Sequence, residues 1–200
     1  MYIREYQHKD ESSWVRCRVL SFLDTAYFDD VLKEKDKYRG SSIELVAVEN
    51  EQIIGLIDIE YENKEGTIFS NNEQGLGGMI WHIAVHPDFR RLGIGRKLLH
   101  AAQKKLTILG IKYLEAWTRD DEWVHKWYRQ NEFRVCESYF HVFIDTKKQL
   151  NEIIHCSAGN IYPIQLFAHY TGTNKEQIKR DYKRVHECFR YQKNLQVKIK

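Results

Sequence analysis

The stretch Val85–Leu99, VHPDFRRLGIGRKLL, leads from an apolar run through His86 and Pro87 into arginines, two glycines and an amphipathic pattern. Proline ends a strand, because it has no backbone N–H to pair. Apolar residues then recur at three- and four-residue intervals up to Leu109, which predicts a helix over residues 94–109, with Gly110 placed to end it. The stretch therefore indicates a strand that passes through a glycine turn into a long helix.

The glycine turn is a candidate anion site. A helix start carries free backbone N–H groups and the positive end of the helix dipole. Gly93 and Gly95 lack the Cβ atoms that would keep a phosphate away from the backbone. The spacing fits neither a P-loop nor a complete dinucleotide fingerprint. We predict a pyrophosphate cradle, with a simple glycine-capped helix as the structural alternative.

Length and composition suggest one globular domain, or one domain with an appendage. The chain has 200 residues, of which 42% are hydrophobic and 30% charged. There is no apolar run long enough to span a bilayer and no apolar core of a signal peptide at the start, so we expect a cytoplasmic protein without membrane contact. The four cysteines have neither metal-site nor redox-motif spacing, and no metal is expected.

The first 145 residues alternate between strand and helix patterns. Such an order predicts an α/β fold with a mixed sheet and helices on its faces. We predict strands over 1–6, 43–48, 52–61, 79–85, 113–117 and 133–144, and helices over 12–26, 29–37, 94–109 and 122–130. A turn over 49–51 is expected to join the second and third strands as a hairpin.

Residues 146–200 differ in charge from the rest. They hold 11 Lys and Arg against 4 Asp and Glu. We predict a helix near 148–155, a strand over 161–168, and a last helix that begins at Thr173–Glu176, a capping-box pattern, and continues through Phe189. We therefore expect a domain over 1–145 and a basic extension over 146–200 packed on or beside it. Without a dense basic run, the extension indicates a solvated face rather than nucleic-acid binding.

The segment from Arg90 to Gly95 resembles the Arg/Gln-x-x-Gly-x-Gly/Ala signature of the GNAT superfamily of N-acetyltransferases. YLEAWTRDDEWVHKWYRQNEF, residues 113–133, resembles the family's next strand and the helix that carries a tyrosine. The resemblance covers residues 1–144. It implies a twisted, mostly antiparallel sheet in which two parallel strands splay apart, followed here by a C-terminal helical extension. It also implies acetyl-CoA as co-substrate and transfer of an acetyl group to a primary amine.

The resemblance assigns the cofactor site to the two splayed strands and the glycine turn. The pantetheine arm is expected on backbone groups of the first strand, the pyrophosphate on the turn, and Thr118 beside the cofactor. The expected cofactor-binding residues are Ile83, Ala84, Val85, Arg90, Arg91, Leu92, Gly93, Ile94, Gly95, Arg96 and Thr118.

Tyr128 matches the family's catalytic tyrosine, which supplies a proton or hydrogen bond to the leaving thiolate. A core-packing ring is the alternative. The family usually has Gly-Phe after this helix, whereas this chain has Glu132-Phe133. We expect Asn131 to take the left-handed conformation in place of that glycine.

The general base is left open. Met79 and Trp81 would face the acceptor but cannot act as bases, and strand alternation is expected to turn His82 to the other face. Asp58 and Glu60 share a face of the neighbouring strand and are candidates, as is a water chain.

The acceptor is predicted from SFLDTAYFDD, residues 21–30. Its aspartates Asp24, Asp29 and Asp30 beside Tyr27 and Phe28 would suit a small cationic amine, although a solvated helix end explains them equally well. A protein lysine or N-terminal acetyltransferase and a non-catalytic acyl-CoA-binding module are the alternatives. A homodimer is compatible with the sequence.

Overall fold

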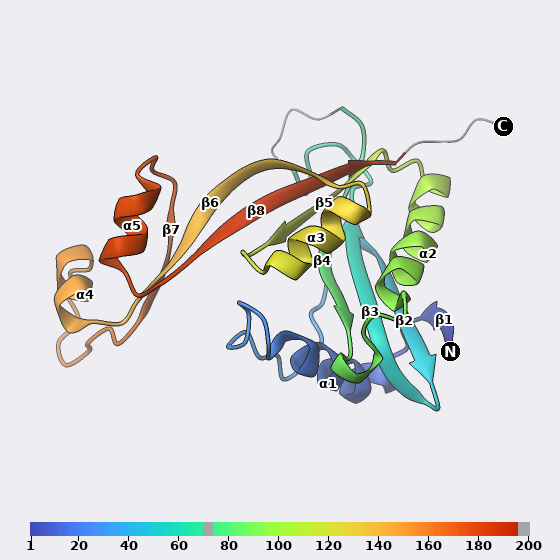
Figure 1. Cartoon of the computed structure of the whole chain (residues 1–200), viewed down its shortest axis with the longest axis horizontal. Helices are drawn as coiled ribbons and strands as arrows, with labels where there is room; N and C mark the ends of the chain where they lie inside the picture. Colours follow the sequence, from blue (N-terminus) through green and yellow to red (C-terminus); the bar gives the residue numbers. More distant parts are fainter. Residues whose placement is uncertain (70–73, 196–200) are drawn as a thin grey trace.

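A computed structural model of the chain describes residues 1–69 and 74–195. One eight-stranded sheet forms its centre, with helices on both faces (Figure 1). The strands are β1 (Tyr2–Glu5), β2 (Ser41–Glu49), β3 (Gln52–Tyr61), β4 (Gly77–Val85), β5 (Tyr113–Thr118), β6 (Arg134–Ile144), β7 (Leu166–Tyr170) and β8 (Arg184–Asn194). The helices are α1 (Glu11–Phe22), α2 (Ile94–Ile108), α3 (Glu122–Gln130), α4 (Lys147–Ile153) and α5 (Lys175–Asp181).

The strands lie in the order β1-β2-β3-β4-β5-β8-β6-β7. Each neighbouring pair is antiparallel except β4 and β5, which are parallel. A parallel pair needs a crossover connection, and α2 supplies it. The predicted mixed, mostly antiparallel sheet with one parallel pair at its centre is confirmed.

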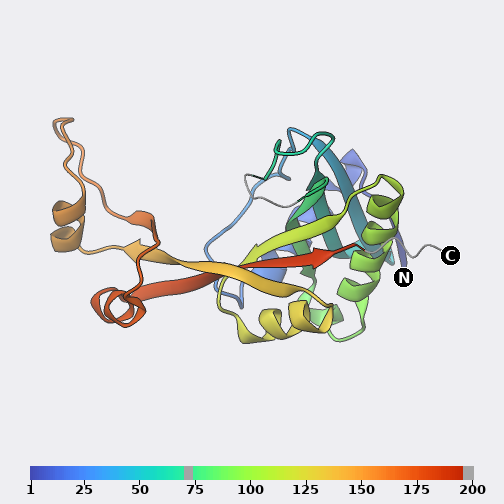
Figure 2. The same cartoon turned by 90° about the horizontal axis from the view of Figure 1, so that it is seen from above.

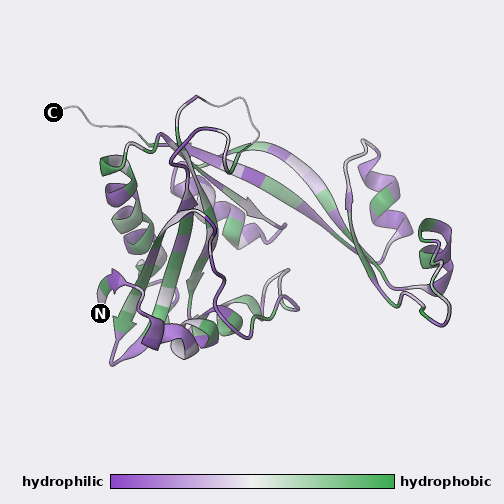
Figure 3. Ribbon diagram, turned by 180° about the vertical axis from the view of Figure 1, so that it is seen from behind, coloured by the Kyte–Doolittle hydropathy of each residue, from purple (hydrophilic) through white to green (hydrophobic). Residues whose placement is uncertain are grey.

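Two hydrophobic layers hold the helices to the sheet. On one face, Trp14 and Cys17 of α1 pack against Val46 and Leu56. On the other face, α2 and α3 cover a larger cluster that includes Leu98. The central strands are predominantly hydrophobic along their length, because helices cover both of their faces (Figure 3).

The predicted connections around the first hairpin and the long helix are confirmed. Asn50 and Glu51 have φ values of 48° and 64°, as a two-residue hairpin turn requires. α2 ends at Ile108, and Gly110 follows it with φ of 82°. A left-handed residue after the last turn is a common helix stop.

The predicted helix through Phe189 is wrong. α5 ends at Asp181, and β8 begins at Arg184. β8 pairs with β5 on one side and with β6 on the other, so strands from both sides of residue 145 belong to one sheet. Val185, Phe189 and Tyr191 fit a period of two as well as helical spacing, and the tertiary partners decide in favour of the strand.

The short helix predicted over 29–37 is also wrong. The segment between α1 and β2 has turns and no helix. Lys35 anchors it, with Nζ 2.9 Å from Asp58 and 2.8 Å from Glu44. The same ammonium lies 4.7 Å from the ring centre of Tyr38 and 5.1 Å from that of Trp14. Buried ion pairs and cation–π contacts, rather than helical hydrogen bonds, therefore fix this loop.

β6 and β8 extend from the body as a long ribbon, which we call the arm (Figure 2). Residues 145–183 at its far end, the distal lobe, include α4, β7 and α5. The lobe has its own small core, to which Phe140, Val142 and Leu150 contribute. None of the helices in the described residues combines the length and apolar character that crossing a membrane would require.

Candidate active site

β4 and β5 separate halfway along their length. Their pairing runs from Gly77–Tyr113 to Ile80–Ala116 and stops there. β4 continues to Val85, and β5 to Thr118, without pairing with each other. The predicted splay between the two parallel strands is therefore present, and it begins beyond Ile80.

Backbone groups of β4 face the gap. The N–H of His86 donates to the carbonyl of Ile54 on β3, so hydrogen bonds at even-numbered positions point toward β3. Alternation then directs the N–H and C=O groups of Ile83 and Val85 toward the gap. Arg90 Nε lies 3.4 Å from the Val85 carbonyl. Ala84 is buried on the α1 face, and Thr118 is buried at the end of β5, where its hydroxyl lies 3.4 Å from the Arg119 carbonyl.

A β-bulge lies at the point where the strands separate. Ile80 is opposite Ile59 and His82 is opposite Asp58, so Trp81 has no partner on β3. His82 contacts Asp36, and Trp81 Nε1 donates to Glu60 at 3.0 Å. The expectation that alternation turns His82 away from Trp81 is therefore wrong, because the extra residue resets the alternation.

The glycine turn has the backbone conformation expected of an anion cradle. Gly93 caps α2 with φ of 74°, and a Cβ there would meet nothing within 4 Å. Arg91 is also left-handed, with φ of 66°. Arg91, Leu92, Gly93 and Arg96 are exposed, whereas Ile94 and Gly95 are buried. The free N–H groups of the first helical turn are thus presented at an open, positively charged surface.

Arg90 differs from its two arginine neighbours. Its guanidinium binds both carboxylate oxygens of Asp24, at 2.6 and 2.9 Å, and donates to the Ser21 carbonyl at 2.8 Å. Arg90 therefore ties the glycine turn to the end of α1. The exposed side chains of Arg91 and Arg96 remain beside the turn.

Tyr128 lies in the main hydrophobic core. Its ring stacks on Tyr191, with centroids 4.9 Å apart, and meets Trp127 and Phe133 edge-on. The residue is only 4% exposed, and burial raises the pKa of its phenol above the usual value. Its phenol therefore keeps its proton at neutral pH, as a hydrogen-bond donor must.

The turn after α3 corrects one expectation. Glu132 has φ of 66°, while Asn131 has φ of −99°. The left-handed residue is thus Glu132 rather than Asn131. The Asn131 amide instead donates to the Trp127 carbonyl at 2.8 Å, and Lys193 binds the Glu132 carboxylate at 2.9 Å.

The three candidate bases differ in availability. Asp58 is 0% exposed and is bound by Lys35 and by the Tyr38 hydroxyl. Glu60 accepts from Gly40 N at 2.6 Å as well as from Trp81.

His82 Nε2 lies 2.8 Å from Asp36 Oδ2, and the hydrogen bond with His82 lowers the pKa of that carboxyl. The acceptor carboxylate places the ring proton on Nε2, which leaves the lone pair on Nδ1. Nδ1 is buried and has no hydrogen-bond partner among the described residues.

The three aspartates predicted to bind a cationic acceptor already pair with arginines of the chain. Asp24 binds Arg90, Asp29 binds Arg184 at 2.6 Å, and Asp30 binds Arg18 at 2.9 Å. Because each carboxylate is neutralised within the protein, this loop does not present three free negative charges.

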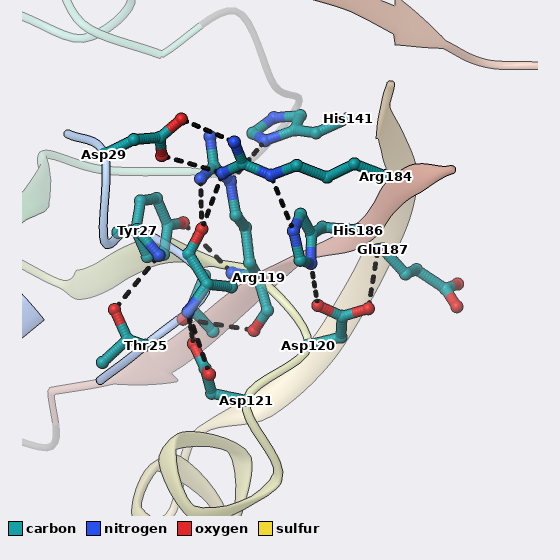
Figure 4. Close-up of polar contacts among 12 residues, drawn as sticks. Thr25, Tyr27, Asp29, Arg119, Asp120, Asp121, His141, Arg184, His186 and Glu187 are labelled. Carbon is teal, nitrogen blue, oxygen red and sulfur yellow. Dashed lines mark hydrogen bonds and ion pairs between the residues drawn. The ribbon is translucent and has the colours of Figure 1, made fainter. Parts of the chain in front are cut away.

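A polar cluster that the sequence analysis missed joins this loop to β5 and the arm (Figure 4). Arg119 donates to the Ala26 carbonyl at 2.6 Å and to His141 Nδ1 at 3.0 Å. Asp120 binds His186 at 2.8 Å. In the sequence, this cluster could have been predicted from the dense polar run Thr118-Arg119-Asp120-Asp121 at the end of an apolar strand.

Comparisons with known proteins agree with this geometry. Residues 40–135 match the family model of the acetyltransferase (GNAT) domain. A GNAT-family acetyltransferase from Streptococcus pneumoniae superposes with a TM-score of 0.61 at 15% identity, covering 98% of this chain and 99% of that one. The ribosomal-protein-S18-alanine N-acetyltransferase of Escherichia coli gives 0.57 at 14% identity, covering 98% and 94%.

A third structure, the PaiA N-acetyltransferase of Thermoplasma acidophilum in complex with coenzyme A, gives a TM-score of 0.51 at 15% identity, covering 68% of this chain and 90% of that one. At such identities the likeness concerns the fold. The family model identifies residues 40–135 as similar to a GNAT acetyltransferase domain, and the solved structures show that the chain shares the fold of this superfamily.

Proposed function

We propose that the protein transfers an acetyl group from acetyl-CoA to a primary amine. The observation that carries this proposal is the stretch of β4 beyond Ile80 that does not pair with β5, together with the left-handed Gly93 turn that follows this strand. Backbone groups of Ile83 and Val85 are available to an extended ligand, as at a sheet edge. The N–H groups of the first turn of α2, with Arg91 and Arg96, suit a pyrophosphate.

The chain supplies a proton acceptor and a proton donor for this reaction. Acetyl-CoA supplies the thioester, whose C–S bond breaks as the new amide N–C bond forms. His82 takes the proton that leaves the attacking amine, which reaches the buried Nδ1 through water, and Asp36 stabilises the resulting imidazolium. Tyr128 gives a proton or hydrogen bond to the departing thiolate. This assignment favours His82 over Asp58 and Glu60, which are held by other groups.

A small cationic amine is the acceptor that the bulge favours. Trp81 is 52% exposed and is held by the Glu60 carboxylate on the same face as His82. An exposed indole beside a carboxylate attracts an ammonium group by cation–π and charge interactions. This pair replaces the three loop aspartates as the basis for a cationic acceptor, because those aspartates bind arginines.

Two measurements test the proposal. Calorimetric titration with acetyl-CoA should show saturable binding, and its absence would contradict the cofactor assignment. Release of free thiol from acetyl-CoA should then be followed with aminoglycosides, polyamines and peptides bearing a free N-terminus. Turnover with the first two groups supports a small cationic acceptor. Turnover with peptides alone would identify a protein acetyltransferase, and binding without any turnover would indicate an acyl-CoA-binding module.

A further inference from the structure

The distal lobe contains the longest uncharged stretch of the chain. Residues 153–174 include no Asp, Glu, Lys or Arg, although 30% of all residues in the protein are charged. Apolar side chains of this stretch are nevertheless at the surface: Ile161 is 62% exposed, Tyr162 78%, Ile164 84% and Phe167 46%. An uncharged, exposed apolar surface of this kind is typical of a protein–protein contact.

The same stretch forms an edge of the sheet. β7 pairs with β6 and is the last strand in the order, so its other side presents backbone donors and acceptors. Proteins usually protect such edges with charged side chains.

The opposite edge is protected in this way, because β1 contains Arg4, which pairs with Asp10, and Glu5, which pairs with Lys105. β7, with the sequence LFAHY, has no charged side chain, and its register with β6 runs without a shift.

We propose that β7 is a dimerisation strand, which pairs antiparallel with β7 of a second copy of this chain. A two-fold axis at Ala168, the middle residue of the strand, would place Phe167 of one copy opposite His169 of the other. Rings already gather on this face, since Phe167 lies 4.9 Å from His141 and 5.0 Å from Phe143. The pairing would extend this aromatic surface and satisfy the outward backbone groups.

A second copy fits this surface better than another partner. Antiparallel pairing of one strand with itself is self-complementary, which closed two-fold symmetry requires. An uncharged edge does not repel its own copy and offers no charge to complement a charged peptide. The arm also carries β7 to the end of the molecule away from the body (Figure 2), so the two bodies would lie at opposite ends of the dimer.

Mass measurement of the full chain by light scattering after size exclusion tests the proposal. At tens of micromolar we expect the wild type at twice the 24.0 kDa of one chain. Ile164→Lys, alone and with Phe167→Lys, should give the single-chain mass. Ile164 is so exposed that its replacement should not disturb folding, which circular dichroism would check.

Ile108→Lys is the matched control, because Ile108 is an isoleucine 87% exposed at the end of α2, far from the lobe. This variant should remain a dimer. A monomeric wild type, a dimer that survives the double substitution, or an equal loss in the control would each overturn the proposal. None of these results depends on whether the protein transfers acetyl groups.

Discussion

Arg90 and Asp24 bind each other through two parallel contacts, Nη1–Oδ2 at 2.6 Å and Nη2–Oδ1 at 2.9 Å. From the sequence, one belongs to a cofactor cradle and the other to an acceptor site. Their ion pair joins the glycine turn to the end of α1, and Arg90 lowers the pKa of the Asp24 carboxyl.

Breaking this ion pair should change the position of the glycine turn more than the stability of the protein. The Asp24 side chain is 60% exposed, so we expect Asp24→Asn to cost only about 0.5 kcal/mol of unfolding free energy. The acetyl-CoA Kd should change less than in Arg91→Ala or Arg96→Ala, whose exposed guanidinium groups have no acidic partner among the described residues. Denaturant unfolding and calorimetric titration measure both effects. A larger loss of affinity in Asp24→Asn than in the two arginine variants would contradict this division.

Gly93→Ala should weaken acetyl-CoA binding by roughly tenfold or more, because a Cβ would stand between the ligand and the N–H groups of the turn. The positive φ should also cost about 1 kcal/mol of stability. Gly110→Ala is the matched control, since Gly110 has φ of 82° and open space around its Cα at the other end of α2. It should lose similar stability and keep the wild-type Kd. Equal losses of affinity in the two variants would contradict a role of Gly93 in binding the phosphates of acetyl-CoA.

Tyr128→Phe removes one hydroxyl and leaves the stacked ring in place. We expect kcat to fall by about 10²-fold or more, with little change in cofactor affinity, because a general acid acts in the transition state. Tyr191→Phe serves for comparison, since it loses a buried hydrogen bond of 2.9 Å to His125. That variant should lose stability but keep most of its turnover. Unchanged kcat in Tyr128→Phe would assign this ring to packing alone.

His82→Gln should lower kcat with little change in the acetyl-CoA Kd, because it removes the proposed proton acceptor. Asp36→Asn should lower kcat less, since it removes only the 2.8 Å contact of the carboxylate with Nε2. Glu60→Gln, which alters another carboxylate on the same face, should raise the KM for the amine rather than lower kcat, because Glu60 holds Trp81. An unchanged kcat in His82→Gln would exclude His82 as the base.

The cluster around Arg119 should make stability depend on pH. Burial, followed by the charge of Arg119, lowers the pKa of His141 to about 4, below the value of about 6.5 for an unfolded chain. The neutral ring accepts the Arg119 hydrogen bond, so its contribution is present above pH 6.5 and is lost as pH falls toward 4.

As pH is lowered from 6.5 to 4, the denaturant midpoint of the wild type should therefore decrease, and that of His141→Gln should decrease less. His8→Gln, at a side chain 95% exposed, should follow the wild type. Parallel curves for wild type and His141→Gln would contradict this account.

The sequence by itself determined the local features of this protein. The Val85–Leu99 stretch, the turn at Asn50 and Glu51, and the 94–108 helix all follow from short-range constraints: proline geometry, left-handed glycine and helical periodicity. The splayed strands and the cofactor-binding residues were expected from the resemblance to the GNAT superfamily rather than from these local constraints.

Tertiary structure decided what depends on a distant partner. Residues 184–194 form a strand because they pair with β5 on one side and with β6 on the other, although their apolar spacing also fits a helix. His82 shares a face with Trp81 because a bulge resets the alternation, and Asp24, Asp29 and Asp30 are neutralised by Arg90, Arg184 and Arg18. Local patterns constrain φ and ψ, whereas pairing and charge compensation depend on residues far apart in the chain, which only folding brings together.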